Sequence, residues 1–194
     1  MYSEKVYKNS YVIHDVFDDP KTVKQYITDY CKNNDPVEQQ YAAGKRWVDP
    51  QPAFSISDIL KHVKQLNEGR SLTNDAMQYQ FVSEQDGMYN WIHKDHFWTG
   101  IIYLQEDVPE DCGTALYSLD NSVVIEKEYQ KLYINNNPLL HFYPDHPAWN
   151  LVYESKYIFN TMFFFRGDKH FHMGNEGYGT DLDNSRLTIP LFFR

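Results

Sequence analysis

The stretch KYIFNTMFFFRGDKHFHMG, residues 156–174, decides how this chain is interpreted. It opens with aromatic and aliphatic residues that suit a half-buried pleated surface, which predicts a strand. The run ends in a polar turn at 166–168, and His170 and His172 follow that turn. A strand that ends in a turn with imidazole side chains is a place where a β-rich fold can present groups for chemistry.

The same texture recurs through the second part of the chain. After residue 72, runs rich in aromatic and β-branched residues alternate with turn residues, which predicts successive antiparallel strands. These runs are AMQYQFVSE (76–84), GMYNWIHKD (87–95), WTGIIYLQE (98–106), GTALYSL (113–119) and SRLTIPLFF (185–193).

Two helices are expected before these strands. Asp18-Asp19-Pro20 is typical of a helix start, because acids and proline suit the first turn. The first helix continues over 21–34, and the second is expected over 55–69 with Ser55 or Ser57 as its cap. The apolar stripes that face the core are Val23, Tyr26, Ile27, Tyr30 and Cys31 in the first helix and Ile56, Ile59, Leu60, Val63 and Leu66 in the second.

Helices followed by antiparallel strands predict an α+β fold that is mainly β, a sandwich or barrel buttressed by helices on one side. The length of 194 residues suits one domain, and no linker divides it. We expect a single domain over 1–194, with a helical flank at 1–72 and a β core at 73–194. Residues 120–150 fit neither period and are expected to form a long irregular insertion.

Composition restricts the classes of partner. The formal net charge is −9, which argues against nucleic-acid binding because that needs a basic footprint. The two cysteines, Cys31 and Cys112, form no metal-binding or disulfide pattern, so reduced thiols in a cytoplasmic protein are expected. No signal peptide is evident, and the apolar runs are too short to span a membrane.

The stretch IHKDHF (92–97) offers a metal-binding pair. His93 and Asp95 are two apart, so on a strand they point to the same face and can meet one ion. An imidazole and a carboxylate suit Fe(II). The pair alone is a weak signal, and a solvated strand edge explains it as well.

A third ligand and an anion-binding pair strengthen the metal hypothesis. His170 or His172 would complete a face of two histidines and one carboxylate, which leaves positions open for a co-substrate and dioxygen. Arg186 and Thr188 share a face of the last expected strand. Arginine holds a carboxylate with a fork of two donors, and a threonine hydroxyl can add one hydrogen bond.

These motifs, taken in order, resemble the iron(II)- and 2-oxoglutarate-dependent dioxygenases. The segments that carry the resemblance are IHKD, WTGIIYL, PEDCGTALY, WNLVYESKYIFNTMFFFRGDKHFHMGNEGYG and SRLTIPLFF, within residues 79–194. The chain is most similar to a small phage and bacterial branch related to the prolyl 4-hydroxylase and phytanoyl-CoA hydroxylase groups. The resemblance implies a double-stranded β-helix (jelly-roll) core.

The resemblance also implies roles for individual residues. His93, Asp95 and His172 would bind iron, and we favour His172 over His170 because Phe171-His172 and Tyr178-Gly179 match the spacing of the family pattern. Arg186 would bind the C5 carboxylate of 2-oxoglutarate. Thr188 would assist it, and Tyr103 would reach the same carboxylate.

The reaction implied is hydroxylation of a peptidyl side chain or small metabolite by dioxygen, with release of succinate and CO2. The carboxylate Asp95 favours hydroxylation over halogenation, because the related halogenases have a small residue there. Two other classes stay open: a catalytically inactive jelly-roll binding or structural module, and a cupin-like metalloenzyme without 2-oxoglutarate. The substrate, the oligomeric state and the choice between His170 and His172 are not decided by sequence.

Overall fold

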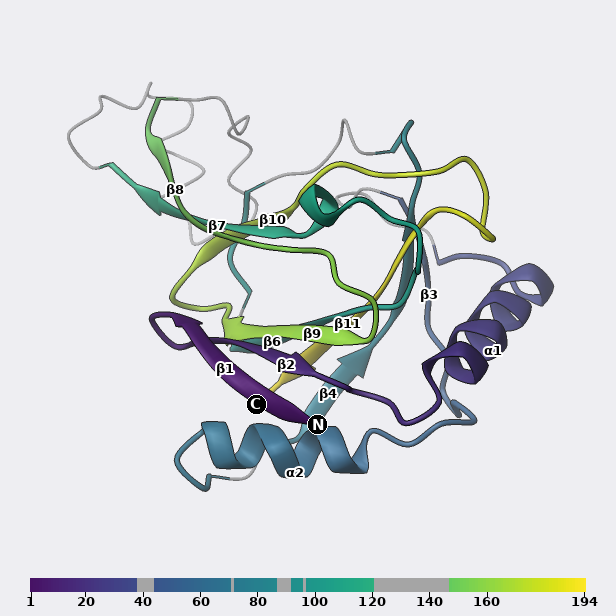
Figure 1. Cartoon of the computed structure of the whole chain (residues 1–194), viewed down its shortest axis with the longest axis horizontal. Helices are drawn as coiled ribbons and strands as arrows, with labels where there is room; N and C mark the ends of the chain where they lie inside the picture. Colours follow the sequence, from purple (N-terminus) through teal and green to yellow (C-terminus); the bar gives the residue numbers. More distant parts are fainter. Residues whose placement is uncertain (38–43, 71, 87–91, 96, 121–146) are drawn as a thin grey trace.

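The computed structural model describes residues 1–37, 44–70, 72–86, 92–95, 97–120 and 147–194 (Figure 1). Its described residues form an eight-stranded sheet and a three-stranded sheet. In the large sheet the neighbours run β1 (Tyr2–Tyr7), β2 (Ser10–His14), β9 (Thr161–Arg166), β6 (Trp98–Tyr103), β11 (Arg186–Phe193), β5 (Tyr79–Val82) and β3 (Lys45–Trp47), with β4 (Asn74–Met77) also paired to β11. The small sheet runs β10 (Phe171–Gly174), β7 (Thr114–Leu119) and β8 (Trp149–Ser155).

The chain crosses between the two sheets in the order of a jelly roll. It passes from β6 in the large sheet to β7 and β8 in the small sheet, back to β9, across to β10, and returns to β11. A backbone bridge between His93 and His172 adds the end of a further segment beside β10. The predicted fold class, mainly β with a jelly-roll core, is confirmed.

Two helices cover the outer face of the large sheet. Helices α1 (Pro20–Asn33) and α2 (Ser57–Leu66) lie on the side away from the small sheet (Figure 1). Their buried residues Val23, Ile27, Ile59 and Val63 pack in one apolar cluster with alternate residues of the large sheet. The predicted apolar stripes are confirmed, because their remaining members are buried or packed against this same cluster.

The other face of the large sheet looks toward the small sheet. Because side chains alternate along a strand, Tyr103, Phe163 and Phe165 turn away from the helices. They pack with Leu116 of β7 in a second apolar cluster. Every polar group in the candidate site described below lies on or beside this inner face.

The first helix begins as the sequence predicts. The Asp19 carboxylate accepts a hydrogen bond from the Thr22 backbone N–H at 3.2 Å, which satisfies one of the free donors at the helix start. The prediction that Ser55 or Ser57 caps the second helix is wrong. Ile56 occupies the cap position without a side-chain hydrogen bond, and the Ser55 hydroxyl accepts from the Ser57 N–H instead.

Several strands were not predicted, because their residues alternate weakly or are few. Strands β1, β3 and β10 are examples, and two of them extend the large sheet into the expected helical flank. Strand β8 begins at Trp149, inside the stretch expected to be irregular, while residues 121–146 of that stretch lie outside the described residues. Of the strand expected at 87–95, only 92–95 are described.

Cys31 and Cys112 are both buried, and neither is in a disulfide. Among the helices in the described part of the chain, none is long and apolar enough to cross a membrane.

Candidate metal and cofactor site

Three side chains meet at one end of the inner face. His93, Asp95 and His172 each offer one ligand atom, and these atoms lie within 4.8 Å of one another. His172 Nε2 is 3.2 Å from Asp95 Oδ2, and His93 Nε2 is 3.8 Å from Asp95 Oδ1. Two imidazoles and a carboxylate gathered on one side of an ion are the ligand set of non-haem Fe(II) sites.

Backbone pairing fixes the two histidines. The His93 N–H donates to the His172 carbonyl at 2.9 Å, and the His172 N–H donates to the His93 carbonyl at 2.8 Å. This reciprocal pair brings the two ring centroids to 4.4 Å. The edge of Phe165 packs against the His172 ring at 4.7 Å and limits its rotation. The reciprocal hydrogen bonds therefore fix the backbones of the two histidines relative to each other.

Asp95 is held by Thr99 and by the turn at Gly167, which approaches it closely. Its N–H donates to the Gly167 carbonyl at 3.1 Å, and the Thr99 hydroxyl donates to its Oδ2 at 2.6 Å. A Cβ on Gly167 would lie 2.4 Å from Thr99 Oγ1 and 2.8 Å from Asp95 Cβ. Only glycine fits at position 167 without displacing the carboxylate.

The local charges keep Asp95 ionised. Burial by itself raises the pKa of this carboxyl group, but the facing His172 and His93 and the hydrogen bond from Thr99 lower it further, so the net pKa lies well below its ordinary value. An ionised carboxylate is the form that binds a cation. Asp95 is therefore in the form that can bind a cation at neutral pH.

His170 lies outside this group. Its Nε2 is hydrogen-bonded to the Lys8 carbonyl at 2.8 Å, and its ring packs against Tyr7 at 5.6 Å. His170 and His172 are two apart, and on an ideal strand they would point to the same face. His170 precedes β10, however, and does not follow the alternation of that strand. The structure brings His172, and not His170, to His93 and Asp95.

Arg186 lies on the same inner face, at the start of β11. Its Nε donates to the Cys112 carbonyl at 2.6 Å and its Nη2 to the Gly113 carbonyl at 3.0 Å. These bonds use the side edge of the guanidinium, so the end formed by Nη1 and Nη2 can still receive a carboxylate. Gly174 lies against the guanidinium, where a Cβ would be 3.3 Å from Nη2.

Thr188 lies beside Arg186 and carries a buried hydroxyl group. Its side chain is fully buried, and its Oγ1 has no hydrogen-bond partner among the described residues. A buried hydroxyl without a partner costs about 1–3 kcal/mol. Thr188 shares the inner face with Arg186, two residues away on one strand. A carboxylate on Arg186 would give this hydroxyl an acceptor.

Tyr103 lies opposite Thr188 on the neighbouring strand β6. Its hydroxyl donates to Thr114 Oγ1 at 2.9 Å and is 2.7 Å from Ser155 Oγ, both on the small sheet. Burial raises the pKa of Tyr103, and the nearby Arg186 charge opposes that rise. The phenol therefore stays protonated and links the two sheets beside the arginine.

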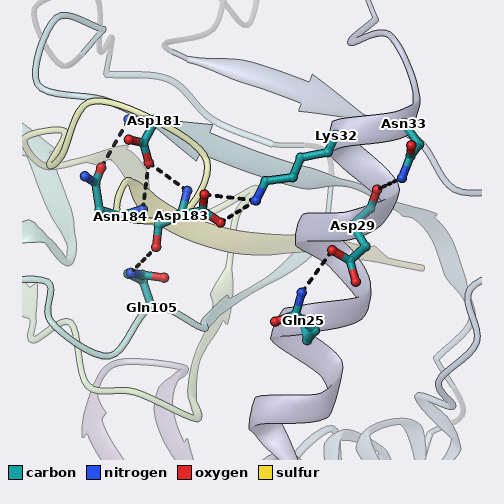
Figure 2. Close-up of polar contacts among 8 residues, drawn as sticks. All are labelled: Gln25, Asp29, Lys32, Asn33, Gln105, Asp181, Asp183 and Asn184. Atoms are coloured by element: carbon teal, nitrogen blue, oxygen red, sulfur yellow. Dashed lines mark hydrogen bonds and ion pairs between the residues drawn. The ribbon is translucent and has the colours of Figure 1, made fainter.

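The loop that leads into Arg186 is fastened to the rest of the fold (Figure 2). Asn184 Oδ1 accepts from the Thr180 N–H at 2.7 Å, and Asp181 Oδ1 accepts from the Asp183 N–H at 2.9 Å. Lys32 of α1 forms an ion pair with Asp183 at 2.6 Å. These contacts fix where β11 begins, and so fix the arginine.

Asn160 and Trp98 have structural roles. Asn160 exchanges two hydrogen bonds of 2.9 Å with the backbone of Phe17, so its amide is satisfied away from the site. Trp98 stacks on Phe164 at 4.5 Å in the cluster under the helices.

Sequence reasoning missed Thr99 and Gly167, which hold Asp95, and Arg46, discussed below. No periodicity marks them, because their roles depend on which segments meet in space. The only sequence signal for Gly167 was its place in the turn before His172, because turns often require glycine.

Comparison with known proteins supports the architecture. A prolyl hydroxylase from Trichoplax adhaerens, solved with a hypoxia-inducible factor peptide fragment, matches 95% of this chain and 83% of its own, with a TM-score of 0.61 and 13% identity. HygX from Streptomyces hygroscopicus, solved with nickel and 2-oxoglutarate, matches 95% and 82%, with a TM-score of 0.59 and 12% identity.

A prolyl 4-hydroxylase from Pseudomonas putida matches 96% of this chain and 92% of its own, with a TM-score of 0.53 and 12% identity. No protein-family model and no curated protein sequence matches the chain. The chain thus has the fold of the iron- and 2-oxoglutarate-dependent oxygenases, at identities that establish the fold alone.

Proposed function

We propose that the protein is an Fe(II)- and 2-oxoglutarate-dependent dioxygenase that hydroxylates a peptidyl side chain or a small metabolite. The observation that carries this proposal is the grouping of His93, Asp95 and His172 on the inner face that also holds Arg186 and the unpartnered Thr188 hydroxyl. The first three would bind the metal on one side and leave the other side open.

The residues fit 2-oxoglutarate as well as iron. Arg186 and Thr188 would hold its C5 carboxylate, and Tyr103 would lie beside them between the two sheets. We call these three residues the 2-oxoglutarate cradle. Bound together, iron(II) and 2-oxoglutarate supply the oxidation of a substrate C–H bond by dioxygen, with succinate and CO2 as co-products. Water is excluded from the inner face next to these groups by the buried side chains of Phe163, Phe165 and Leu116. HygX, which has the same fold, was solved with nickel and 2-oxoglutarate.

The rival classes explain less of the site. A jelly-roll binding module needs neither three converging ligands nor an ionised, hydrogen-bonded Asp95. A cupin-like metalloenzyme without 2-oxoglutarate would leave the open guanidinium edge of Arg186 and the Thr188 hydroxyl without a function. We therefore favour the dioxygenase over both.

Anaerobic titration tests the proposal. Fe(II) and then 2-oxoglutarate are added to the metal-free protein, and the visible charge-transfer band of their complex is followed. We expect the band in the wild type and in His170→Ala, and its loss in His172→Ala. The matched histidine variant controls for a general loss of imidazole. A folded wild type that neither binds iron nor develops the band would refute the dioxygenase and favour the binding module.

A further inference from the structure

A second arginine, Arg46, reaches the inner face from strand β3. Arg46 lies opposite Gln80 of β5, and Gln80 lies opposite Thr188 of β11. Residues that face each other across antiparallel strands point to the same side of the sheet. Trp47, the next residue, packs against Phe81 under the helices, as the alternation requires. Arg46 therefore shares its side of the sheet with the 2-oxoglutarate cradle.

The hydrogen bonds of Arg46 leave one edge of its guanidinium without a partner among the described residues. Nη1 donates to Gln78 Oε1 at 2.9 Å, which anchors the group. Nε is buried and donates to no described residue, and no described carboxylate forms an ion pair with the side chain. Nε and Nη2 form the side edge of the guanidinium, whose parallel N–H groups match the two oxygens of a carboxylate.

Arg46 also lies near the candidate metal ligands. Burial lowers the pKa of the guanidinium, and the charge of Asp95 acts in the opposite direction. The two groups are thus within electrostatic reach of each other. Arg46 is partly buried and has no ion-pair partner among the described residues. A desolvated cation without an anion is unfavourable, and an arginine in this state suits an anionic ligand.

We propose that Arg46 binds a carboxylate of the substrate with its Nε–Nη2 edge and thereby positions the substrate beside the iron. This inference rests on the proposed function. The carboxylate is not the C5 group of 2-oxoglutarate, because Arg186 and Thr188 lie on β11 while Arg46 lies two strands away. At about 4.8 Å per strand, the backbones of β3 and β11 are about 10 Å apart, and we assign the two arginines to separate subsites on this ground.

Fluorine NMR tests this subsite with a simple probe. The protein is loaded with Co(II) and saturating 2-oxoglutarate, and the relaxation of trifluoroacetate is compared with that of neutral trifluoroacetamide. We expect paramagnetic relaxation of the acid to exceed that of the amide in the wild type. Arg46→Gln should reduce the affinity for trifluoroacetate about 10-fold or more, by loss of a charged pair. Arg46→Lys should keep part of the effect.

Controls test whether Arg46 itself holds the acid. Arg70→Gln removes an exposed arginine and should leave the relaxation unchanged. Thermal melts and 2-oxoglutarate affinity of Arg46→Gln should match the wild type. Equal relaxation of acid and amide in the wild type would refute the subsite, because the acid would then have no preferred site near the metal. Full retention of the acid's excess relaxation in Arg46→Gln would also refute it, and would indicate that trifluoroacetate binds the metal directly.

Failure of the proposed function would give a different result. If Co(II) and 2-oxoglutarate do not bind, line broadening of the trifluoroacetate signal in the metal-free protein still reports binding at Arg46. Broadening in the wild type and its loss in Arg46→Gln would support the anion subsite without the dioxygenase. Equal line widths in both proteins would refute the subsite too.

Discussion

Thr188→Val is the sharpest test of the 2-oxoglutarate cradle, because it should raise the stability of the ligand-free protein and lower its affinity for 2-oxoglutarate. Valine has nearly the shape of threonine but no hydroxyl. In the protein without ligand, the Thr188 hydroxyl is fully buried and has no partner among the described residues. Its removal should therefore stabilise the ligand-free protein, or leave the stability unchanged.

The expected change in stability follows from the hydrogen bond that the Thr188 hydroxyl lacks in the ligand-free protein. The expected change in affinity follows from the hydrogen bond that 2-oxoglutarate would add. An unsatisfied buried hydroxyl costs about 1–3 kcal/mol, so we expect a gain of up to about 2 kcal/mol in the free energy of unfolding. A hydrogen bond to a charged carboxylate contributes about 1.5–3 kcal/mol. Its loss corresponds to about a 10-fold to 100-fold rise in the dissociation constant of 2-oxoglutarate.

Two measurements check these signs. Thermal unfolding of the metal-free protein gives the change in stability, where 1 kcal/mol corresponds to about 2–4 °C for a domain of this size. Anaerobic titration of the iron-loaded protein with 2-oxoglutarate gives the affinity.

Thr161→Val is the matched control. Thr161 is buried in the same sheet, opposite Tyr103, and its hydroxyl donates to the Ile158 carbonyl at 2.8 Å. Its replacement should lower stability by about 1 kcal/mol and leave 2-oxoglutarate affinity unchanged. If Thr188→Val destabilised the protein and left the affinity intact, Thr188 would be an ordinary core residue and the proposed cradle would be wrong.

Gly167→Ala should weaken Fe(II) binding while the fold is kept, because the added Cβ would meet Thr99 Oγ1 at 2.4 Å and Asp95 Cβ at 2.8 Å; unchanged iron affinity in a titration would contradict the role of this close approach. Burial raises the pKa of the Cys31 thiol to about 12, so the folded protein holds this proton more tightly than the unfolded chain. Its contribution to stability is complete below the unfolded pKa of about 8.5 and falls by up to about 1.4 kcal/mol per pH unit above it. Urea unfolding between pH 8 and 10 should show a shallower decline for Cys31→Ala, and identical slopes would contradict the burial effect.

The local features of the sequence were the most predictable. The two apolar helical stripes, the acidic cap at Asp19 and the strongly apolar strands β6, β9 and β11 each depend on residues close in the chain, so their periodicity is visible directly. Short or weakly alternating strands such as β3 and β8 were missed. Pairing with a neighbouring strand stabilises them, and that partner is distant in sequence.

The order of the chemical groups was determined by the sequence alone. The pair His93 and Asp95, a later histidine, and Arg186 with Thr188 can be recognised because alternation on a strand sets which side chains share a face. The same alternation and the number of strand runs predict a mainly β fold, while the jelly-roll core was implied by the resemblance to the iron(II)- and 2-oxoglutarate-dependent dioxygenases.

Only the tertiary structure decided which groups meet. His170 and His172 have equivalent positions in the alternation, but the backbone pair with His93 begins at His172 and leaves His170 beside Lys8. The unpaired hydroxyl of Thr188 and the unpaired Nε of Arg46 likewise can be recognised only once β3, β5 and β11 lie side by side. A sequence sets the residues of each strand, but the partner of each strand is chosen by burial and backbone pairing over the whole chain.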